Sequence, residues 1–209
     1  MKTTEMKKIR KAMEKCQDAK RFEHTLGVAY TAAALAMRYG ESVKKAQLAG
    51  LLHDCAKCMS DEKKLDLCEK YNISITEYEK EHPYLLHAKV GSFLAIYEYH
   101  VDDDDIINAI LNHTTGRPGM SLLEKIIYVA DYIEPGRGNN GKEPPGLDEI
   151  RKMSFMDLDE ALLRILYNTI TYLKDTKGDL DEITQKTYNY YLERRKETPS
   201  ERSKIWKQG

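Results

Sequence analysis

The residues best suited to chemistry are His53 and Asp54, which stand side by side where an apolar helical pattern ends. Lys57 follows three residues later, so this stretch carries an imidazole, a carboxylate and a fixed positive charge. Imidazole and carboxylate together suit first-row transition metal ions, and one carboxylate can bridge two ions. The pair could instead bond to the backbone at a helix end. Further ligands elsewhere in the chain must therefore decide between a metal site and a helix end.

Four more candidate ligands occupy similar places along the chain. His24, His87 and His113 lie at or near the ends of predicted helices, beside loops or small residues, and Asp131 ends another apolar helical pattern. These residues are spread over positions 24–131, so their spacing alone does not show that they converge.

The elements that must position these residues are helices, because apolar residues recur every three to four positions and no alternating pattern is present. Ser121 and Glu124 form a capping box, and the Gly- and Pro-rich segment 134–146 is expected to be a long irregular loop. The pattern predicts an all-α protein with one bundle of about nine or ten helices in residues 1–195 and a polar, basic tail at 196–209. Helices are expected at about residues 4–16, 21–39, 42–54, 60–71, 76–82, 85–97, 105–113, 121–131, 157–177 and 181–195.

Composition excludes several classes of function. The 209 residues are 41% hydrophobic, which is enough for a sizeable core, and the formal charge of -1 gives no general attraction to nucleic acid or anionic lipid. Neither a secretion signal nor a membrane-spanning run is evident, so a cytoplasmic protein is expected. The four cysteines are expected to be reduced, and the Cys55–Cys58 pair lacks the second ligand pair of a structural zinc site.

Five motifs occur in order along the chain: Arg21-Phe22-Glu23-His24, Leu51-Leu52-His53-Asp54 with Lys57, Leu86-His87-Ala88, His113-Thr114-Thr115-Gly116-Arg117, and Ala130-Asp131-Tyr132-Ile133-Glu134-Pro135 with Arg137. Together they resemble the HD-domain phosphohydrolases and, among these, the bacterial YqeK family of symmetrical diadenosine tetraphosphate hydrolases. The resemblance covers about residues 8–192, and its last two motifs are not general features of HD proteins.

The resemblance implies a single HD-domain helical bundle that hydrolyses diadenosine tetraphosphate to two ADP. It implies a binuclear iron centre, with other divalent transition ions as alternatives, in which Asp54 bridges the ions and acts in catalysis with Lys57. The implied metal ligands are His24, His53, Asp54, His87, His113 and Asp131. Substrate contacts are implied for Lys57, Thr114, Thr115, Gly116 and Arg117, and Arg21 and Arg137 are added as candidates.

Two of these residues have other interpretations. Arg21 could pair with Glu23 or Glu14 instead of contacting substrate, and Arg137 could fix the long loop together with Glu134. His82 and His100 match no motif, and both are expected at the surface.

Other functions also stay open at this point. A second HD-type reaction would act on a guanine alarmone, a cyclic dinucleotide or a nucleoside monophosphate. A nucleotide sensor would use the metal for binding only, and a diiron oxygenase could share the scaffold. The expected ligand is a dinucleoside polyphosphate or a nucleoside diphosphate. Neither nucleic acid nor membrane is expected as a partner, and a homodimer is left open.

Overall fold

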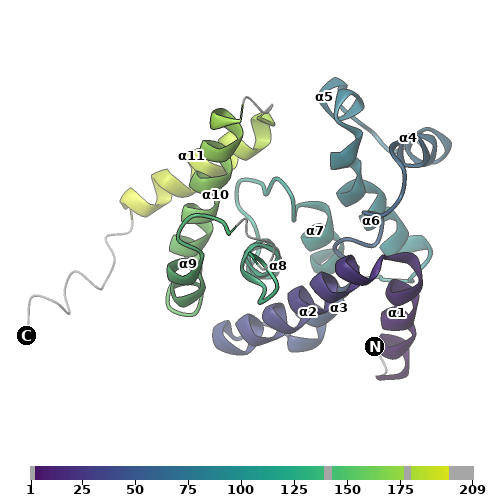
Figure 1. The fold of residues 1–209 in the computed structure, drawn as a ribbon, viewed down its shortest axis with the longest axis horizontal. Coiled ribbons are helices and arrows are strands. Elements are labelled where there is room, and N and C mark those ends of the chain that lie inside the picture. The colour runs from purple at the N-terminus through teal and green to yellow at the C-terminus, as the bar shows by residue number, and fades with distance from the viewer. Residues whose placement is uncertain (1–2, 139–142, 177–179, 198–209) are drawn as a thin grey trace, which may run out of the picture.

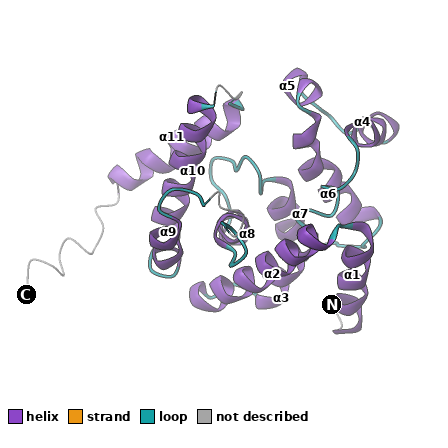
Figure 2. Cartoon of the chain, in the orientation of Figure 1, coloured by secondary structure: helices purple, strands orange, loops and turns teal. Residues whose placement is uncertain are grey.

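The computed structural model describes residues 3–138, 143–176 and 180–197, and within these ranges every regular element is helical (Figures 1 and 2). The all-α prediction is confirmed, with eleven α-helices and one short 3-10 helix in the described residues. None of these helices combines the length and the apolar character needed to cross a bilayer. The helices are α1 (Thr3–Cys16), α2 (Ala19–Tyr39), α3 (Val43–Leu52), α4 (Asp61–Lys70), α5 (Glu77–Glu81), η1 (Pro83–Leu85), α6 (Leu86–Tyr97), α7 (Asp104–Leu111), α8 (Leu122–Ile133), α9 (Leu147–Ser154), α10 (Leu158–Asp175) and α11 (Glu182–Glu197).

Local sequence signals account for most helix ends. Asp18 caps α2 by accepting a hydrogen bond from the backbone N–H of Arg21, and Gly40 ends this helix in the left-handed conformation, with φ of 76°. The capping box that Ser121 and Glu124 predict is present at the start of α8. These signals therefore fix where the ligand-bearing helices begin and end.

The core forms around α2, α3 and α8. Helix α2 packs against both α3 and α8, and α3 packs against α7 and α8 (Figure 1). The contact between α2 and α3 is very close, because a Cβ atom built on Gly50 would lie 2.7 Å from the Cα atom of Ala29. Only glycine permits this approach, which holds the end of α3 against α2.

The remaining helices flank this core on two sides (Figure 1). Helix α6 packs against α7, and α4 packs against α6. On the other side, α9 and α11 each pack against α10, and both α9 and α10 contact α8. Helix α9 was not among the expected helices. It follows a Gly- and Pro-rich segment and begins at Gly146 in a left-handed conformation without a side-chain cap. Part of the expected loop 134–146, namely 139–142, lies outside the described residues, as do Gly178 and most of the basic tail.

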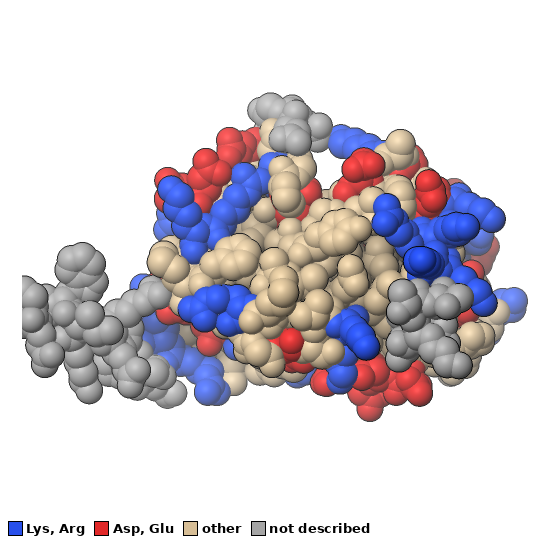
Figure 3. All heavy atoms as spheres, turned by 90° about the horizontal axis from the view of Figure 1, so that it is seen from below, with Lys and Arg blue, Asp and Glu red and all other residues tan. Residues whose placement is uncertain are grey.

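Charges of both signs are interspersed around the face that Figure 3 shows, and uncharged residues occupy its middle. This arrangement agrees with the formal charge of -1, and that face has no broad basic surface of the kind that tracks a nucleic-acid backbone.

Candidate metal centre

The six predicted ligands come together in space although five separate segments carry them. His24 lies in α2, His53 and Asp54 directly follow α3, His87 lies in the first turn of α6, His113 follows α7, and Asp131 lies in α8. All four imidazoles have an Nε2 atom within 3.8 Å of an oxygen atom of Asp54. Asp54 therefore stands at the centre of the cluster.

The two oxygen atoms of Asp54 face different histidines. Oδ2 lies 3.4 Å from Nε2 of His53 and 3.8 Å from Nε2 of His24. Oδ1 lies 3.4 Å from Nε2 of His87 and 3.5 Å from Nε2 of His113. The carboxylate thus divides the imidazoles into two pairs, an arrangement in which one carboxylate can serve two ions.

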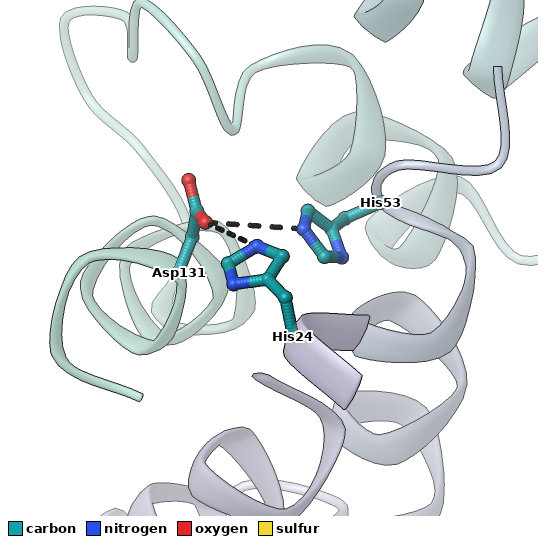
Figure 4. A group of neighbouring side chains, drawn as sticks. All are labelled: His24, His53 and Asp131. Atoms are coloured by element: carbon teal, nitrogen blue, oxygen red, sulfur yellow. Dashed lines mark ion pairs between the residues drawn. The ribbon is translucent and has the colours of Figure 1, made fainter. Parts of the chain in front are cut away.

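Two groups of three ligand atoms are compact enough to hold a metal ion. His24, His53 and Asp131 form the first group, in which Nε2 of His24 lies 3.0 Å from Oδ1 of Asp131 (Figure 4). The three side chains in Figure 4 point toward one another from α2, from the end of α3 and from α8. His53, Asp54 and His113 form the second group, and the ligand atoms within each group lie within 4.8 Å of one another. His53 belongs to both groups, so the two positions adjoin.

The imidazoles of His53, His87 and His113 are each oriented by the backbone of their own segment. Their Nδ1 atoms lie 2.7, 2.6 and 2.7 Å from the carbonyl oxygens three residues earlier, which belong to Gly50, Tyr84 and Ile110. Each Nδ1–H donates to its carbonyl, so Nε2 is left as a lone-pair ligand that faces inward.

His24 is oriented differently, because its Nδ1 lies 3.2 Å from the carboxylate oxygen Oε1 of Glu134. Gly27, one turn along α2, leaves room for this carboxylate, since a Cβ atom there would lie 2.5 Å from Oε2 of Glu134. Nε2 of His53 is buried without a hydrogen-bond partner, and Nε2 of His24 faces Oδ1 of Asp131 at 3.0 Å. Buried imidazole nitrogen atoms that face carboxylates fit a metal site.

The charges at His24 and Asp131 favour a cation. Burial alone would lower the pKa of His24, but hydrogen bonds to Asp131 and Glu134 outweigh it and raise this pKa to about 9. Burial alone would raise the pKa of Asp131, whereas the hydrogen bond from His24 and the charge of Arg137 hold this pKa below its usual range. This half of the cluster therefore stabilises positive charge between its carboxylates.

The other half of the cluster keeps a neutral imidazole. Burial, with the neighbouring His113 and Lys57, lowers the pKa of His87 to about 3, so this ring is uncharged at neutral pH. Burial opposes ionisation of Asp54, yet the imidazoles of His53 and His113 hold its pKa well below the usual range. An ionised carboxylate beside a neutral imidazole is the protonation state that a metal ligand needs.

Positively charged side chains flank the cluster on two sides. Nζ of Lys57 lies 3.2 Å from Nε2 of His87. On the other side, Arg21 donates to Oδ2 of Asp54 over 2.8 Å, and Arg137 donates to Oδ1 of Asp131 over 2.9 Å. Arg21 therefore pairs with a ligand carboxylate, and neither Glu23 nor Glu14 is its partner in this structure.

Some residues of the loop after α7 contact the cluster, and others contact the surrounding helices. Thr114 reaches the cluster, with Oγ1 at 3.2 Å from Nε2 of His87. Thr115 turns away and donates to the carbonyl oxygen of Gly116. Arg117 forms two hydrogen bonds of 2.7 Å with the buried carboxylate of Glu124. The same carboxylate accepts from the side-chain amide of Asn112, the neighbour of His113, over 2.8 Å, so Arg117 is bonded to the scaffold that carries this ligand.

Two further residues that hold candidate ligands in place were not recognised from the sequence. Glu134 was assigned only to the loop, yet it holds His24 and also accepts from the backbone N–H of Gly136 over 2.6 Å. Gln17 donates through Nε2 to the backbone oxygen of Asp54 over 3.2 Å. Glu134 lies in the fifth motif and could have been found there, whereas nothing in the sequence around Gln17 predicts its contact.

Two predictions outside the cluster have different outcomes. His100 is exposed, as expected. His82 was also expected at the surface, but its ring stacks on Tyr78 and the residue is half-buried. The four cysteines are free thiols, as predicted.

The comparisons with known proteins agree with this fold and site. A family model described as HD domain matches residues 21–136, a span that begins at Arg21 and contains all six predicted ligands. The chain therefore belongs to the HD-domain family, whose members of known activity include metal-dependent hydrolases.

Three similar proteins indicate which members of the HD-domain family this chain resembles in sequence and fold. A protein of Bacillus subtilis named symmetrical bis(5'-nucleosyl)-tetraphosphatase is 44% identical over 82% of this chain and 89% of its own. A protein of the same name from Staphylococcus aureus is 36% identical over 87% of this chain and 91% of its own. A crystal structure from Clostridium acetobutylicum, named a predicted HD superfamily hydrolase involved in NAD metabolism, has a TM-score of 0.84 and 44% identity and covers 90% of this chain and 97% of that one. The resemblance to the YqeK family is thereby confirmed.

Proposed function

We propose that this protein is a metal-dependent hydrolase that cleaves diadenosine tetraphosphate at its centre and releases two ADP. The observation that carries the proposal is the cluster of four imidazoles and two carboxylates in a chain with two symmetrical tetraphosphatases among its relatives. Neither part suffices alone, because similar clusters serve other HD reactions. The cluster supplies a site for metal ions that can act on a phosphate, and the relatives indicate a substrate with a central phosphoric anhydride.

The proposed cofactor is a binuclear iron centre. His24, His53 and Asp131 would hold one ion and His87 and His113 the other, with Asp54 between them, and this assignment is supported by the way its oxygens face the two pairs of imidazoles. Four imidazoles favour iron or another first-row transition ion over magnesium, which prefers oxygen ligands. Bound there, the ions would supply an activated water and neutralise phosphoryl charge.

The surrounding side chains bind and orient the polyphosphate. Lys57 lies at the His87 side of the cluster, and Arg21 and Arg137 lie at the Asp54 and Asp131 side, so phosphate oxygens on both sides of the central bridge meet fixed positive charge. Thr114 adds a hydroxyl donor beside Lys57. We assign Thr115, Gly116 and Arg117 to the shape of this loop, because Arg117 is committed to Glu124 and turns the chain toward α8.

The reaction is tested by the position of cleavage. A water oxygen forms a bond to one inner phosphorus, and the bond from this phosphorus to the central bridging oxygen breaks with its electron pair leaving on the other inner phosphate. One ADP therefore takes up the water oxygen and the other does not. In heavy-oxygen water, a single turnover should place label on the terminal phosphate of only one of the two ADP molecules. AMP and ATP as the first products would contradict symmetrical cleavage.

The alternative substrates belong in the same assay. A guanine alarmone, a cyclic dinucleotide and a nucleoside monophosphate test other HD reactions, and NAD tests the name carried by the Clostridium acetobutylicum protein. We expect each to be turned over at least about 100-fold less efficiently than diadenosine tetraphosphate, a difference of about 2.7 kcal/mol in transition-state binding. Full metal occupancy without any turnover would favour a nucleotide sensor.

A further inference from the structure

A groove of about 880 Å³ opens beside the metal centre, between α2 and the segment 134–138. A volume of this size is typical of a small-molecule site. The metal ligand His24 belongs to its wall, together with Arg21 and Arg137, so the groove begins at the cluster and leads away from it.

The wall that α2 contributes contains, besides Lys20, Glu23 and Leu26, an oblique row of residues spaced by three: Arg21, His24, Gly27 and Tyr30. Nine residues of helix separate its two ends, a length of about 14 Å at 1.5 Å per residue. The row therefore runs from the cluster to a point well outside it and follows one ridge of the helix surface.

The kind of side chain that lines the groove changes from the inner end of the row to its outer end. Arg21 and Arg137 provide guanidinium groups at the inner end, where each is bonded to a ligand carboxylate. Gly27 has no side chain, and the carboxylate of Glu134 lies in the space that a Cβ atom there would need. Tyr30 stands at the outer end with 53% of its surface exposed, and its hydroxyl accepts a hydrogen bond of 3.4 Å from Arg10. Cations, then a carboxylate that can accept from hydroxyls, then an aromatic face match phosphates, ribose and base in that order.

The carboxylates that line the groove do not oppose this order. Asp18 is engaged as the cap of α2, since its Oδ1 accepts from the backbone N–H of Arg21 over 2.8 Å. Glu134 accepts from His24 and from the backbone of Gly136, so its negative charge is directed to these donors. Glu23 is exposed at the edge of the groove, where ribose hydroxyls could donate to it.

Lys57 and Thr114 lie beside His87, and neither of them lines the groove. A substrate with two equal halves and a central anhydride would extend from the metal centre in both directions. We propose that the groove along α2 binds one nucleoside diphosphate half of the substrate, with the base stacked on Tyr30. This inference rests on the proposed function and adds the residue that recognises the base of that half.

Steady-state kinetics of Tyr30→Ala, Tyr30→Phe and the matched control Tyr172→Ala test the proposal, because Tyr172 is an exposed tyrosine of α10 that does not line the groove. Stacking of one base contributes about 1–3 kcal/mol. We therefore expect Tyr30→Ala to raise KM for diadenosine tetraphosphate about tenfold with kcat little changed. Tyr30→Phe and Tyr172→Ala should stay within about twofold of the parent protein. Loss of affinity in Tyr30→Phe equal to that in Tyr30→Ala would overturn stacking, and an unchanged KM in Tyr30→Ala would overturn the groove assignment.

Calorimetric titration of the metal-loaded protein with ADP separates this proposal from the proposed function. The parent protein should bind two ADP molecules, and Tyr30→Ala should bind one of them about tenfold more weakly. This result would support the groove as a site for a nucleoside diphosphate even if diadenosine tetraphosphate were not hydrolysed. Identical titrations of the two proteins would overturn the groove assignment even if the hydrolysis were symmetrical.

Discussion

At the scale of single residues, Asp54 has a position that no other side chain of the centre shares. It is buried, and its two oxygens face two different pairs of imidazoles while Arg21 bonds to one of them. A neutral amide could keep the shape of this side chain but not its charge. Both pairs of imidazoles therefore share this one carboxylate.

We predict that Asp54→Asn lowers activity at least about 100-fold and empties at least one metal position, while the helical content is retained. An amide cannot supply the negative charge that two cations would share. Metal analysis, circular dichroism and turnover measured on the same sample check this prediction. Asp66→Asn, an exposed change on α4, is the matched control and should behave as the parent protein. Unchanged metal content and turnover in folded Asp54→Asn would disprove the central role of this residue.

The motifs identify the six candidate ligands, but they do not predict the bonding partners of the charged side chains around them. Arg21 bonds to Asp54, which is 33 positions away, whereas the sequence offered only the nearby Glu23 and Glu14. Arg117 was expected at a phosphate because guanidinium suits phosphate, yet the buried Glu124 is its partner. Such pairings depend on which helices pack together, and no local pattern contains that information.

At the scale of elements, the approach of α3 to α2 sets the position of His53 and Asp54. Gly50 permits this approach and also supplies the carbonyl oxygen to which His53 donates. Periodicity and caps predicted α3 well, because Ser42 caps its first turn as expected. They did not predict α9, since Gly146 offers no side-chain cap and the preceding residues indicate a loop. The role of Gly50 could not be predicted either, because its close contact depends on Ala29 of the partner helix α2.

Gly50→Ala is expected to destabilise the protein by about 1–3 kcal/mol, although alanine favours a helix more than glycine does. The added methyl group would meet the backbone of Ala29 at 2.7 Å and push α3 away from α2. Urea unfolding measures the change in free energy. Gly91→Ala in α6 is the matched control, because its methyl group would meet Cys55 at an ordinary 3.4 Å. We expect Gly91→Ala to be neutral or slightly stabilising, and equal effects of the two changes would contradict the packing argument.

At the scale of the whole molecule, the metal centre joins parts of the chain that are distant in sequence. Its candidate ligands come from α2, α6 and α8 and from the segments that follow α3 and α7. Sequence periodicity predicts each of these helices separately, and it carries no information on how five segments converge. The resemblance to known proteins supplied that part of the prediction, and the packing of α2, α3, α7 and α8 explains it.

Metal binding should therefore stabilise the complete fold. A ligand present at about 100 times its dissociation constant adds about 2.7 kcal/mol, and about 1 kcal/mol shifts the melting temperature of a protein of this size by about 2–4 °C. We expect the metal-loaded protein to melt about 5–10 °C above the chelator-treated protein, as measured by calorimetry. In Asp54→Asn the difference should be much smaller. Equal melting temperatures with and without chelator in the parent protein would refute this coupling.

The hydrogen bonds that orient the imidazoles also determine how the centre responds to mutation. His53, His87 and His113 each donate to a backbone carbonyl, and every amino acid provides such a carbonyl. Their tautomers are therefore robust to side-chain exchange at Gly50, Tyr84 and Ile110, apart from changes that disturb the helix itself. His24 is oriented by a side chain, so a single codon change at Glu134 can alter its tautomer. Among the described residues, a substitution at Glu134 would therefore change the orientation of a candidate ligand ring directly, whereas the other three rings depend on backbone atoms that substitutions leave in place.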